Sequence, residues 1–121
     1  LDGSATLDLD GLSEFTREVV RLGYKVAITE LDVKDTNLPA DEAERDEKTA
    51  ACAQAYLDCV MAEVKPTTIT PRGYPDDKSW YQFYAWSRRR DKLPSRPLAF
   101  DPDFRRKPLW GVIEKAIADA G

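Results

Sequence analysis

The sequence predicts an α/β fold with parallel strands, and three observations support this prediction. Leucine, phenylalanine and valine residues recur at helical spacing between positions 9 and 22, and Gly23 supplies a helix stop. A β-branched, apolar run follows directly at residues 25–31. A second helical stretch, residues 41–63, leads to a second β-branched run at residues 67–70. Strands that are joined through helices are typical of a parallel sheet.

Each predicted helix has a recognisable start and an apolar face. Asp8 or Asp10 can cap the first helix, and the acidic residues after position 40 suit the positive end of the second helix dipole. Pro66 ends the second helix, and Pro108 stands at a favourable first position for a third helix. The second helix is expected to bury Ala50, Ala53, Leu57, Val60 and Met61, and the third Leu109, Val112, Ile113, Ala116 and Ile117.

Three helices and two strands do not make a self-sufficient sheet. A two-stranded parallel pair leaves both of its edges unpaired and buries little surface. The 121 residues are therefore expected to form one unit, residues 1–121, that is the C-terminal portion of a larger α/β fold. The opening Leu1-Asp2-Gly3 is in keeping with the middle of a protein. A small autonomous α/β module is the alternative.

The composition argues against several classes of function. The chain has 18 basic and 22 acidic residues and a formal charge of −4, which disfavours nucleic acid or an anionic membrane as the main partner. No apolar run is long enough to span a bilayer. There is no histidine, so this chain alone cannot build an imidazole catalyst or a histidine metal site. Cys52 and Cys59 would lie roughly 10 Å apart on a helix, too far for a disulfide, and are expected to be buried as small apolar residues.

The first candidate for chemistry is the stretch at residues 26–33, Val-Ala-Ile-Thr-Glu-Leu-Asp-Val. Its apolar start is typical of a buried parallel strand, and it places Glu30 and Asp32 where that strand ends. Reacting groups of barrels and open α/β sheets lie at this end of the strands. If the chain stays extended, the period of two points both carboxylates to the same side. A strand that simply runs into a polar loop explains the same pattern.

The second candidate is the loop that follows the second strand, residues 72–80. It contains Arg72, Lys78 and Trp80. An aromatic face can pack on the C–H groups of a sugar while polar groups bind its hydroxyls, so this composition suits a sugar. A surface turn with Trp80 packed against the rim of the fold is the alternative.

The third candidate is residues 80–86, which hold five aromatic side chains in seven positions and precede Ser-Arg-Arg-Arg at residues 87–90. Aromatic rings interleaved with arginine can stack on nucleic-acid bases. The basic run is short, however, and Asp91 follows it within an acidic chain. We therefore expect the aromatic rings to pack this loop down and the arginines to face water.

Four motifs in this order resemble glycoside hydrolase family 10, the endo-β-1,4-xylanases. They are the stretch at residues 26–33, Asp-Asp-Lys-Ser-Trp at 76–80, Leu-Pro-Ser-Arg-Pro-Leu-Ala-Phe-Asp at 93–101 and Lys-Pro-Leu-Trp at 107–110. The resemblance covers nearly the whole chain. It implies that the chain is the C-terminal part of a (β/α)8 TIM barrel, about strands seven and eight with their flanking helices.

The resemblance also implies roles for individual residues. Glu30 falls on the nucleophile of a retaining glycosidase, and Asp32 on an aspartate that orients a histidine, which in the family lies just before the position of Leu1. Trp80 matches an aromatic residue that lines the sugar site, and Arg72 and Lys78 are further candidate substrate contacts. The family's acid/base glutamate lies on strand four, and no position of this chain corresponds to it. No metal and no cofactor are implied.

The implied activity is hydrolysis of xylan by a secreted or periplasmic enzyme, with the N-terminal remainder of the barrel as a required partner. Three positions depart from the family pattern: Arg72 stands where a tryptophan is usual, Asp77 replaces a basic residue, and Lys78 replaces a tyrosine. Exchanging an aromatic platform for a guanidinium replaces stacking by charge and hydrogen bonding. A carbohydrate-binding relative that is non-catalytic or of altered specificity is therefore the alternative.

Overall fold

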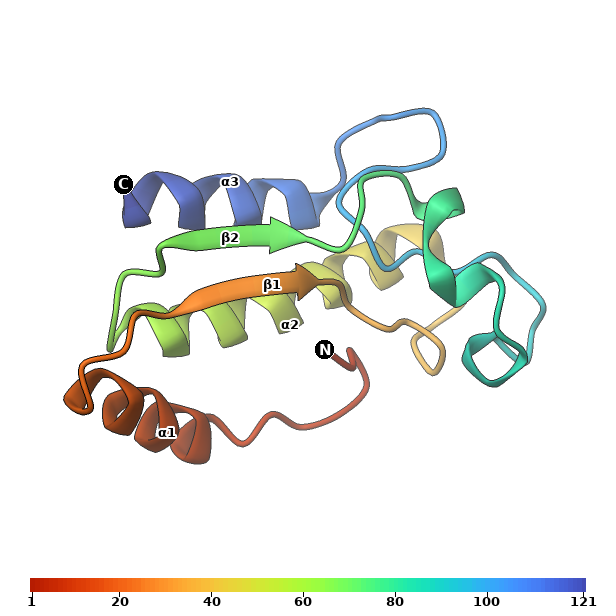
Figure 1. Cartoon of the computed structure of the whole chain (residues 1–121). Coiled ribbons are helices and arrows are strands. Elements are labelled where there is room, and N and C mark those ends of the chain that lie inside the picture. The colour runs from red at the N-terminus through yellow and green to blue at the C-terminus, as the bar shows by residue number, and fades with distance from the viewer.

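The computed structural model describes all residues, 1–121, and contains the five predicted elements in the predicted order (Figure 1). They are α1 (Leu9–Arg21), β1 (Ala27–Leu31), α2 (Glu42–Met61), β2 (Thr68–Pro71) and α3 (Pro108–Ala120). Three single-turn 3₁₀ helices, Asp76–Lys78, Trp80–Gln82 and Ala85–Ser87, lie in the long segment between β2 and α3. None of the helices combines the length and the apolar character that crossing a membrane requires.

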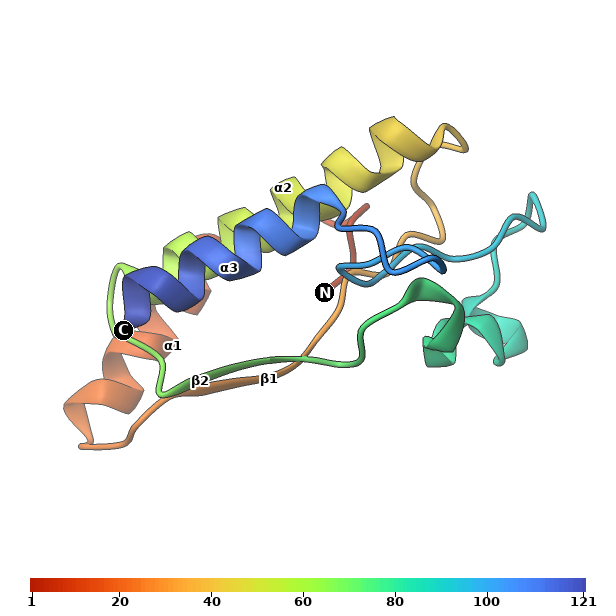
Figure 2. The same cartoon turned by 90° about the horizontal axis from the view of Figure 1, so that it is seen from above.

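The two strands form a two-stranded parallel sheet, which confirms the predicted strand arrangement. Helices α2 and α3 lie together on one side of this sheet (Figure 2). Ile28 and Leu31 of β1 are buried in the core with residues of both helices. On the other side of the sheet, Ala27, Thr29, Thr68 and Thr70 are exposed. One face of the sheet is therefore packed and the other is bare.

The helices bury most of the predicted residues. The buried apolar residues on α2 and α3 are Ala50, Ala53, Leu57, Val60, Leu109, Ile113 and Ala116. Ile117, which was expected to be buried, is exposed at the far end of α3. The N-terminal half of α2 also buries Arg45 and Asp46, which the apolar pattern did not predict.

Helix α1 is held less completely than the other two helices. Asp8 is its N-cap and accepts a hydrogen bond from the backbone N–H of Gly11 at 2.9 Å. Phe15 and Leu22 were expected to line its apolar face, but both are exposed. An apolar groove lined mainly by hydrophobic side chains remains open between α1 and β1. Like the bare face of the sheet, this groove is a surface against which more protein would pack.

The two cysteines are free and half-buried, in agreement with the prediction that they are not bonded to each other. The thiol of Cys59 donates to the carbonyl oxygen of Leu9 at 3.2 Å, and the thiol of Cys52 lies 3.7 Å from the carbonyl oxygen of Asp2. Both thus join α2 to the N-terminal segment.

Strand β1 does not stay regular to its end. Ile28 pairs with Ile69 and Leu31 pairs with Pro71, so Thr29 and Glu30 together face the single residue Thr70. Glu30 has a positive φ of 54°. An extra residue in one strand of a pair forms a β-bulge, which bends the strand and redirects a side chain. In this bulge the residue Glu30 lies in the left-handed region. The simple period of two, which would point Glu30 and Asp32 to one side, therefore does not apply here.

A buried ion pair fixes the long segment between β2 and α3. The ammonium group of Lys107 contacts both carboxylate oxygens of Asp76, at 2.9 and 3.1 Å, and both side chains are buried. The same ammonium donates to the carbonyl oxygens of Arg96 and Leu98 at 2.9 and 2.8 Å. Asp76 also accepts a hydrogen bond from the backbone N–H of Leu98 at 2.9 Å. One buried cation therefore joins the start of α3 to two distant parts of the loop.

The expectation that the arginines after the aromatic cluster face water is wrong for Arg89. Its guanidinium is buried, donates to the carbonyl oxygens of Asp35 and of Leu38 (2.8 Å), and pairs with Asp91 at 2.6 Å. Arg88 and Arg90 are exposed, as expected. The buried arginine satisfies loop carbonyl groups that would otherwise lack partners.

The aromatic rings also differ from the expectation. Tyr81 is buried, but the rings of Phe83, Tyr84 and Trp86 are exposed. These three rings do not pack the loop down. Polar side chains beneath the loop hold it instead, because they can satisfy backbone groups that apolar rings cannot.

We predict that Lys107→Ala destabilises the fold by about 3–5 kcal/mol, because it leaves the Asp76 carboxylate buried without a counter-charge. The measurement is urea-induced unfolding of the chain completed by the rest of the barrel, followed by circular dichroism. The matched control is Lys115→Ala, which removes an exposed lysine paired with Asp119 on the same helix and should cost no more than about 0.5 kcal/mol. Equal effects of the two substitutions would contradict a special role for the buried pair.

Candidate active site

The bulge at the end of β1 places Glu30 in the open. Its side chain is 70% exposed, and one carboxylate oxygen lies 2.8 Å from the guanidinium of Arg72. The backbone N–H of Arg72 donates to the carbonyl oxygen of Leu31 at 3.1 Å, which extends the parallel pairing by one more bond beyond β2. Glu30 and Arg72 thus meet as an ion pair at the carboxyl ends of the two strands.

Trp80 lies next to this ion pair. The guanidinium carbon of Arg72 stands over the Trp80 ring, 5.5 Å from its centroid. The ring of Tyr81 stacks on Trp80 with a centroid distance of 4.5 Å and an interplanar angle of 27°. Glu30, Arg72 and Trp80, which come from three different parts of the sequence, therefore form one contiguous surface.

Asp32 differs from Glu30 in its burial and in the groups that contact it. Its side chain is only 7% exposed, and it accepts hydrogen bonds from the indole N–H of Trp80 at 3.2 Å and from the hydroxyl of Tyr81 at 3.4 Å. Burial raises the pKa of Asp32, and these two donors oppose that rise. Burial and the neighbouring Asp32 raise the pKa of Tyr81 to about 12, so its hydroxyl remains a donor. The Asp32 carboxylate is therefore a buried hydrogen-bond acceptor that Trp80 and Tyr81 hold in place.

The first residue of the chain also lies beside Asp32. The amino nitrogen of Leu1 donates to the carbonyl oxygen of Asp32 at 3.0 Å and lies 4.0 Å from one of its carboxylate oxygens. The backbone at position 1 therefore approaches the same carboxylate that Trp80 and Tyr81 contact.

Lys78 is not brought into this group. Its ammonium pairs with the neighbouring Asp77 at 2.9 Å, and its side chain is largely exposed. No contact joins it to Glu30, Arg72 or Trp80. Three of the five sequence-derived candidates, Glu30, Asp32 and Arg72, thus gather around a fourth, Trp80. Tyr81 joins them as a residue that the sequence did not single out.

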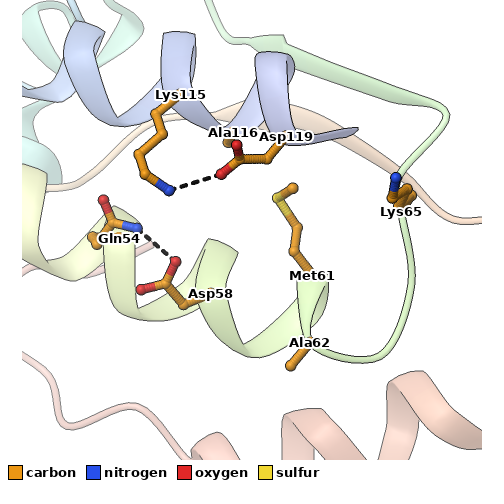
Figure 3. A pocket seen from close by; sticks show the side chains of 8 residues that line it. All are labelled: Gln54, Asp58, Met61, Ala62, Lys65, Lys115, Ala116 and Asp119. Atoms are coloured by element: carbon orange, nitrogen blue, oxygen red, sulfur yellow. Dashed lines mark hydrogen bonds and ion pairs between the residues drawn. The ribbon is translucent and has the colours of Figure 1, made fainter. Parts of the chain in front are cut away.

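A cavity of about 280 Å³ between α2 and α3 lies elsewhere (Figure 3). Its polar side chains pair within their own helices, Gln54 with Asp58 at 2.6 Å and Lys115 with Asp119 at 2.7 Å. These residues belong to the last turns of the two helices, away from the carboxyl ends of the strands. None of the candidate residues lines this cavity, so the candidate site is the surface at Glu30.

Comparison with known proteins assigns the chain to a family. The sequence model of the family described as "Glycosyl hydrolase family 10" matches residues 3–116. The chain belongs to this family. A curated relative, endo-1,4-beta-xylanase 2 of Aureobasidium pullulans, is 29% identical over 115 residues, which are 95% of this chain and 30% of the relative.

Solved structures of family 10 xylanases show the fold. Xylanase 10B from Thermotoga petrophila, solved in complex with xylobiose, superposes with a TM-score of 0.77 at 23% identity. The superposition covers 97% of this chain and 33% of that xylanase. A thermostable mutant of a xylanase from Cellvibrio japonicus gives a TM-score of 0.72 at 21% identity, and the superposition covers 99% of this chain and 38% of that xylanase. The chain thus spans about a third of these family 10 relatives, as the C-terminal part of a (β/α)8 barrel.

We predict that removing a donor raises the pKa of Asp32 further. Trp80→Phe removes the indole N–H that stabilises the ionised carboxylate, so burial of Asp32 is opposed by one donor fewer and its pKa rises further above the usual value. The folded state then keeps this proton to a higher pH than the unfolded chain. The stability that depends on protonated Asp32 is therefore lost as the pH rises through the shifted pKa.

The measurement is an NMR titration of the Asp32 carboxyl carbon. Tyr84→Phe is the matched control, because its ring also touches Trp80 while its hydroxyl makes no hydrogen bond to Asp32. A pKa that is unchanged or lower in Trp80→Phe would contradict the assigned role of the indole.

Proposed function

We propose that this chain supplies the nucleophile of a retaining endo-1,4-β-xylanase, with Glu30 as that nucleophile. The observation that carries the proposal is the exposed Glu30 carboxylate, which stands on a bulge at the carboxyl end of a strand, beside Arg72 and Trp80. Active sites of barrel enzymes lie at this end of the strands. Membership of glycosyl hydrolase family 10 supports glycoside hydrolysis as the reaction class.

Double displacement uses Glu30 in two steps. In the first step one carboxylate oxygen of Glu30 forms a bond to the anomeric carbon of a xylose residue, while the bond from that carbon to the glycosidic oxygen breaks. In the second step water replaces the carboxylate at the same carbon, and Glu30 leaves as a free carboxylate. Two displacements at one carbon retain its configuration.

A second carboxyl group must give a proton to the leaving oxygen and later take one from water, and it must lie about 5–5.5 Å from the first. Asp32 does not fit this role, because it is buried and both of its oxygens accept hydrogen bonds. As the family resemblance implies, the proposed proton donor belongs to the N-terminal part of the barrel, on the same polypeptide or on a companion chain. The bare face of the sheet and the open groove beside α1 support this partner.

Asp32 is proposed as a positioning residue. The Leu1 backbone nitrogen lies within 4.0 Å of its carboxylate. In the proposal, as the family resemblance implies, Asp32 orients toward Glu30 a histidine that the rest of the barrel contributes. Trp80 and Arg72 are proposed substrate contacts, and the structure gives Lys78 the weakest support because it pairs with Asp77.

Xylan is a polymer that does not cross membranes, so we propose a secreted or periplasmic location for the complete enzyme. Neither a metal nor another cofactor takes part in the proposed reaction. Nucleic acid is not a proposed partner, since the chain carries a net charge of −4.

A second candidate function rests on Arg72. Its guanidinium lies 2.8 Å from Glu30 and neutralises part of the charge that a nucleophile needs. A relative with this pair could bind xylan without cleaving it, or could prefer a substrate other than plain xylan.

We predict that Glu30→Ala lowers xylan hydrolysis at least about a thousandfold when the chain is completed by the rest of the barrel, because the attacking group is lost. The measurement is the release of reducing ends from xylan. Glu114→Gln, which removes an exposed carboxylate on α3, is the control and should leave the rate unchanged. A covalent glycosyl label found on a residue other than Glu30 would rule out the assigned role.

The two candidate functions predict different results for the parent protein. Turnover of xylo-oligosaccharides supports the hydrolase. Tight binding without turnover, together with a gain of hydrolysis in Arg72→Trp, supports a binding relative in which Arg72 holds Glu30 inactive. Calorimetric binding and product analysis on the same two proteins distinguish these outcomes.

A further inference from the structure

Three aromatic rings gather at the edge of the candidate site. The centroid of Trp80 lies 5.1 Å from that of Trp86 and 5.5 Å from that of Tyr84, and Tyr84 and Trp86 lie 6.1 Å apart. Trp80 already has Tyr81 and the Arg72 guanidinium against its ring. The free aromatic surface of the cluster therefore belongs mainly to Trp86 and Tyr84.

These two rings are unusually open to solvent. Trp86 is 64% exposed and Tyr84 is 51% exposed. Single exposed aromatic residues are ordinary, but a contiguous exposed apolar patch on a protein surface marks an interaction site. The rings are adjacent to each other and to Trp80, so they form one patch.

The backbone beneath the patch is fixed by buried polar groups. The hydroxyl of Ser87 donates to the carbonyl oxygens of Tyr81 and Tyr84 at 3.0 and 2.8 Å, and the hydroxyl of Thr36 donates to the carbonyl oxygen of Ser87 at 2.9 Å. Arg89, also buried, ties the next turn to the loop after β1. A patch held in place before a ligand arrives loses little conformational freedom on binding.

The patch is continuous with the proposed catalytic residue. Glu30 contacts Arg72, Arg72 stands over Trp80, and Trp80 touches Trp86. Two intervening side chains separate Trp86 from the carboxylate. A ligand on the Trp86 ring would therefore lie beyond the group that Glu30 contacts.

We propose that Trp86 and Tyr84 form a platform for a further xylose unit of the chain bound at Glu30. Carbon-bound hydrogens on the face of a pyranose ring pack on an aromatic face, and the Tyr84 hydroxyl adds a hydrogen-bonding group at the margin. The platform accepts a neutral sugar and requires no charge. This proposal rests on the proposed function for the identity of the polysaccharide.

The test uses the complete barrel with Glu30→Gln, which keeps the substrate intact during the measurement. Trp86→Ala should weaken binding of xylohexaose roughly tenfold, about 1.4 kcal/mol, while binding of xylobiose changes less than about twofold. Trp86→Phe, which keeps an aromatic face, should restore much of the loss. Isothermal titration calorimetry measures both sugars on each variant.

The matched control is Phe83→Ala, because the Phe83 ring is 65% exposed in the same loop but lies outside the three-ring cluster. It should leave both affinities unchanged. An equal loss for the two sugars, no loss for either, or the same loss in Phe83→Ala would overturn the platform. Acrylamide quenching that shows Trp86 shielded in the sugar-free barrel would do so as well, because the ring would then be covered by protein.

The outcome is distinguishable from a failure of the proposed function. If Glu30→Gln keeps full turnover, the nucleophile assignment fails, and a loss of kcat/KM in Trp86→Ala that affects xylohexaose but not xylobiose would still support the platform. Loss of binding to a single-stranded oligonucleotide in Trp86→Ala, with sugar binding unaffected, would assign the patch to nucleic acid and overturn the proposal.

Discussion

The ammonium group of Lys107 is the interaction on which the shape of the site depends. It stands at the start of α3 and contacts Asp76, Arg96 and Leu98 across a loop that has no long helix or strand of its own. A buried charge is stable only when it is fully paired, so the loop has few alternative ways to pass this point. Trp80 follows Asp76 by four residues, so this pair holds the chain just before Trp80.

The two carboxylates near the end of β1 receive opposite environments from one local irregularity. The bulge leaves Glu30 exposed to solvent and to Arg72, whereas Asp32 returns to the interior and meets Trp80 and Tyr81. A left-handed residue other than glycine or asparagine is uncommon and costs about 1–2 kcal/mol. Such strain is often found where a side chain must be presented in a particular direction, which agrees with the role proposed for Glu30.

Much of the fold could be predicted from the sequence. The helix boundaries follow from local signals such as the Asp8 cap and Pro108, and the strands from β-branched runs. The family motifs identified the barrel correctly. The bulge could not be predicted, because neither of its residues, Thr29 and Glu30, is a glycine, the residue type that often marks a bulge. Arg45 and Arg89 were not expected in the interior, because the backbone carbonyl groups that they contact there lie about 50 residues away in the chain.

The candidate site was predicted in part. Glu30, Arg72, Asp32 and Trp80 do lie together, because parallel strands place their carboxyl ends at one edge. Lys78 does not join them, since neighbouring Asp77 is a nearer partner. Tyr81 was missed because its hydroxyl acts on a residue that is distant in sequence. The exposure of Trp86 and Tyr84 was also missed, because composition alone does not distinguish an aromatic ring that packs in the interior from one that stays on the surface.

The bare face of the sheet has a consequence for the size of the side chains on the missing strands. Ala27, Thr29, Thr68 and Thr70 are all small, and the interior of a (β/α)8 barrel is filled by side chains from every strand. Since these two strands contribute little bulk, the other strands must contribute more. If the remaining strands carried equally small residues, the barrel would enclose a void, and each cubic ångström of void costs about 24 cal/mol.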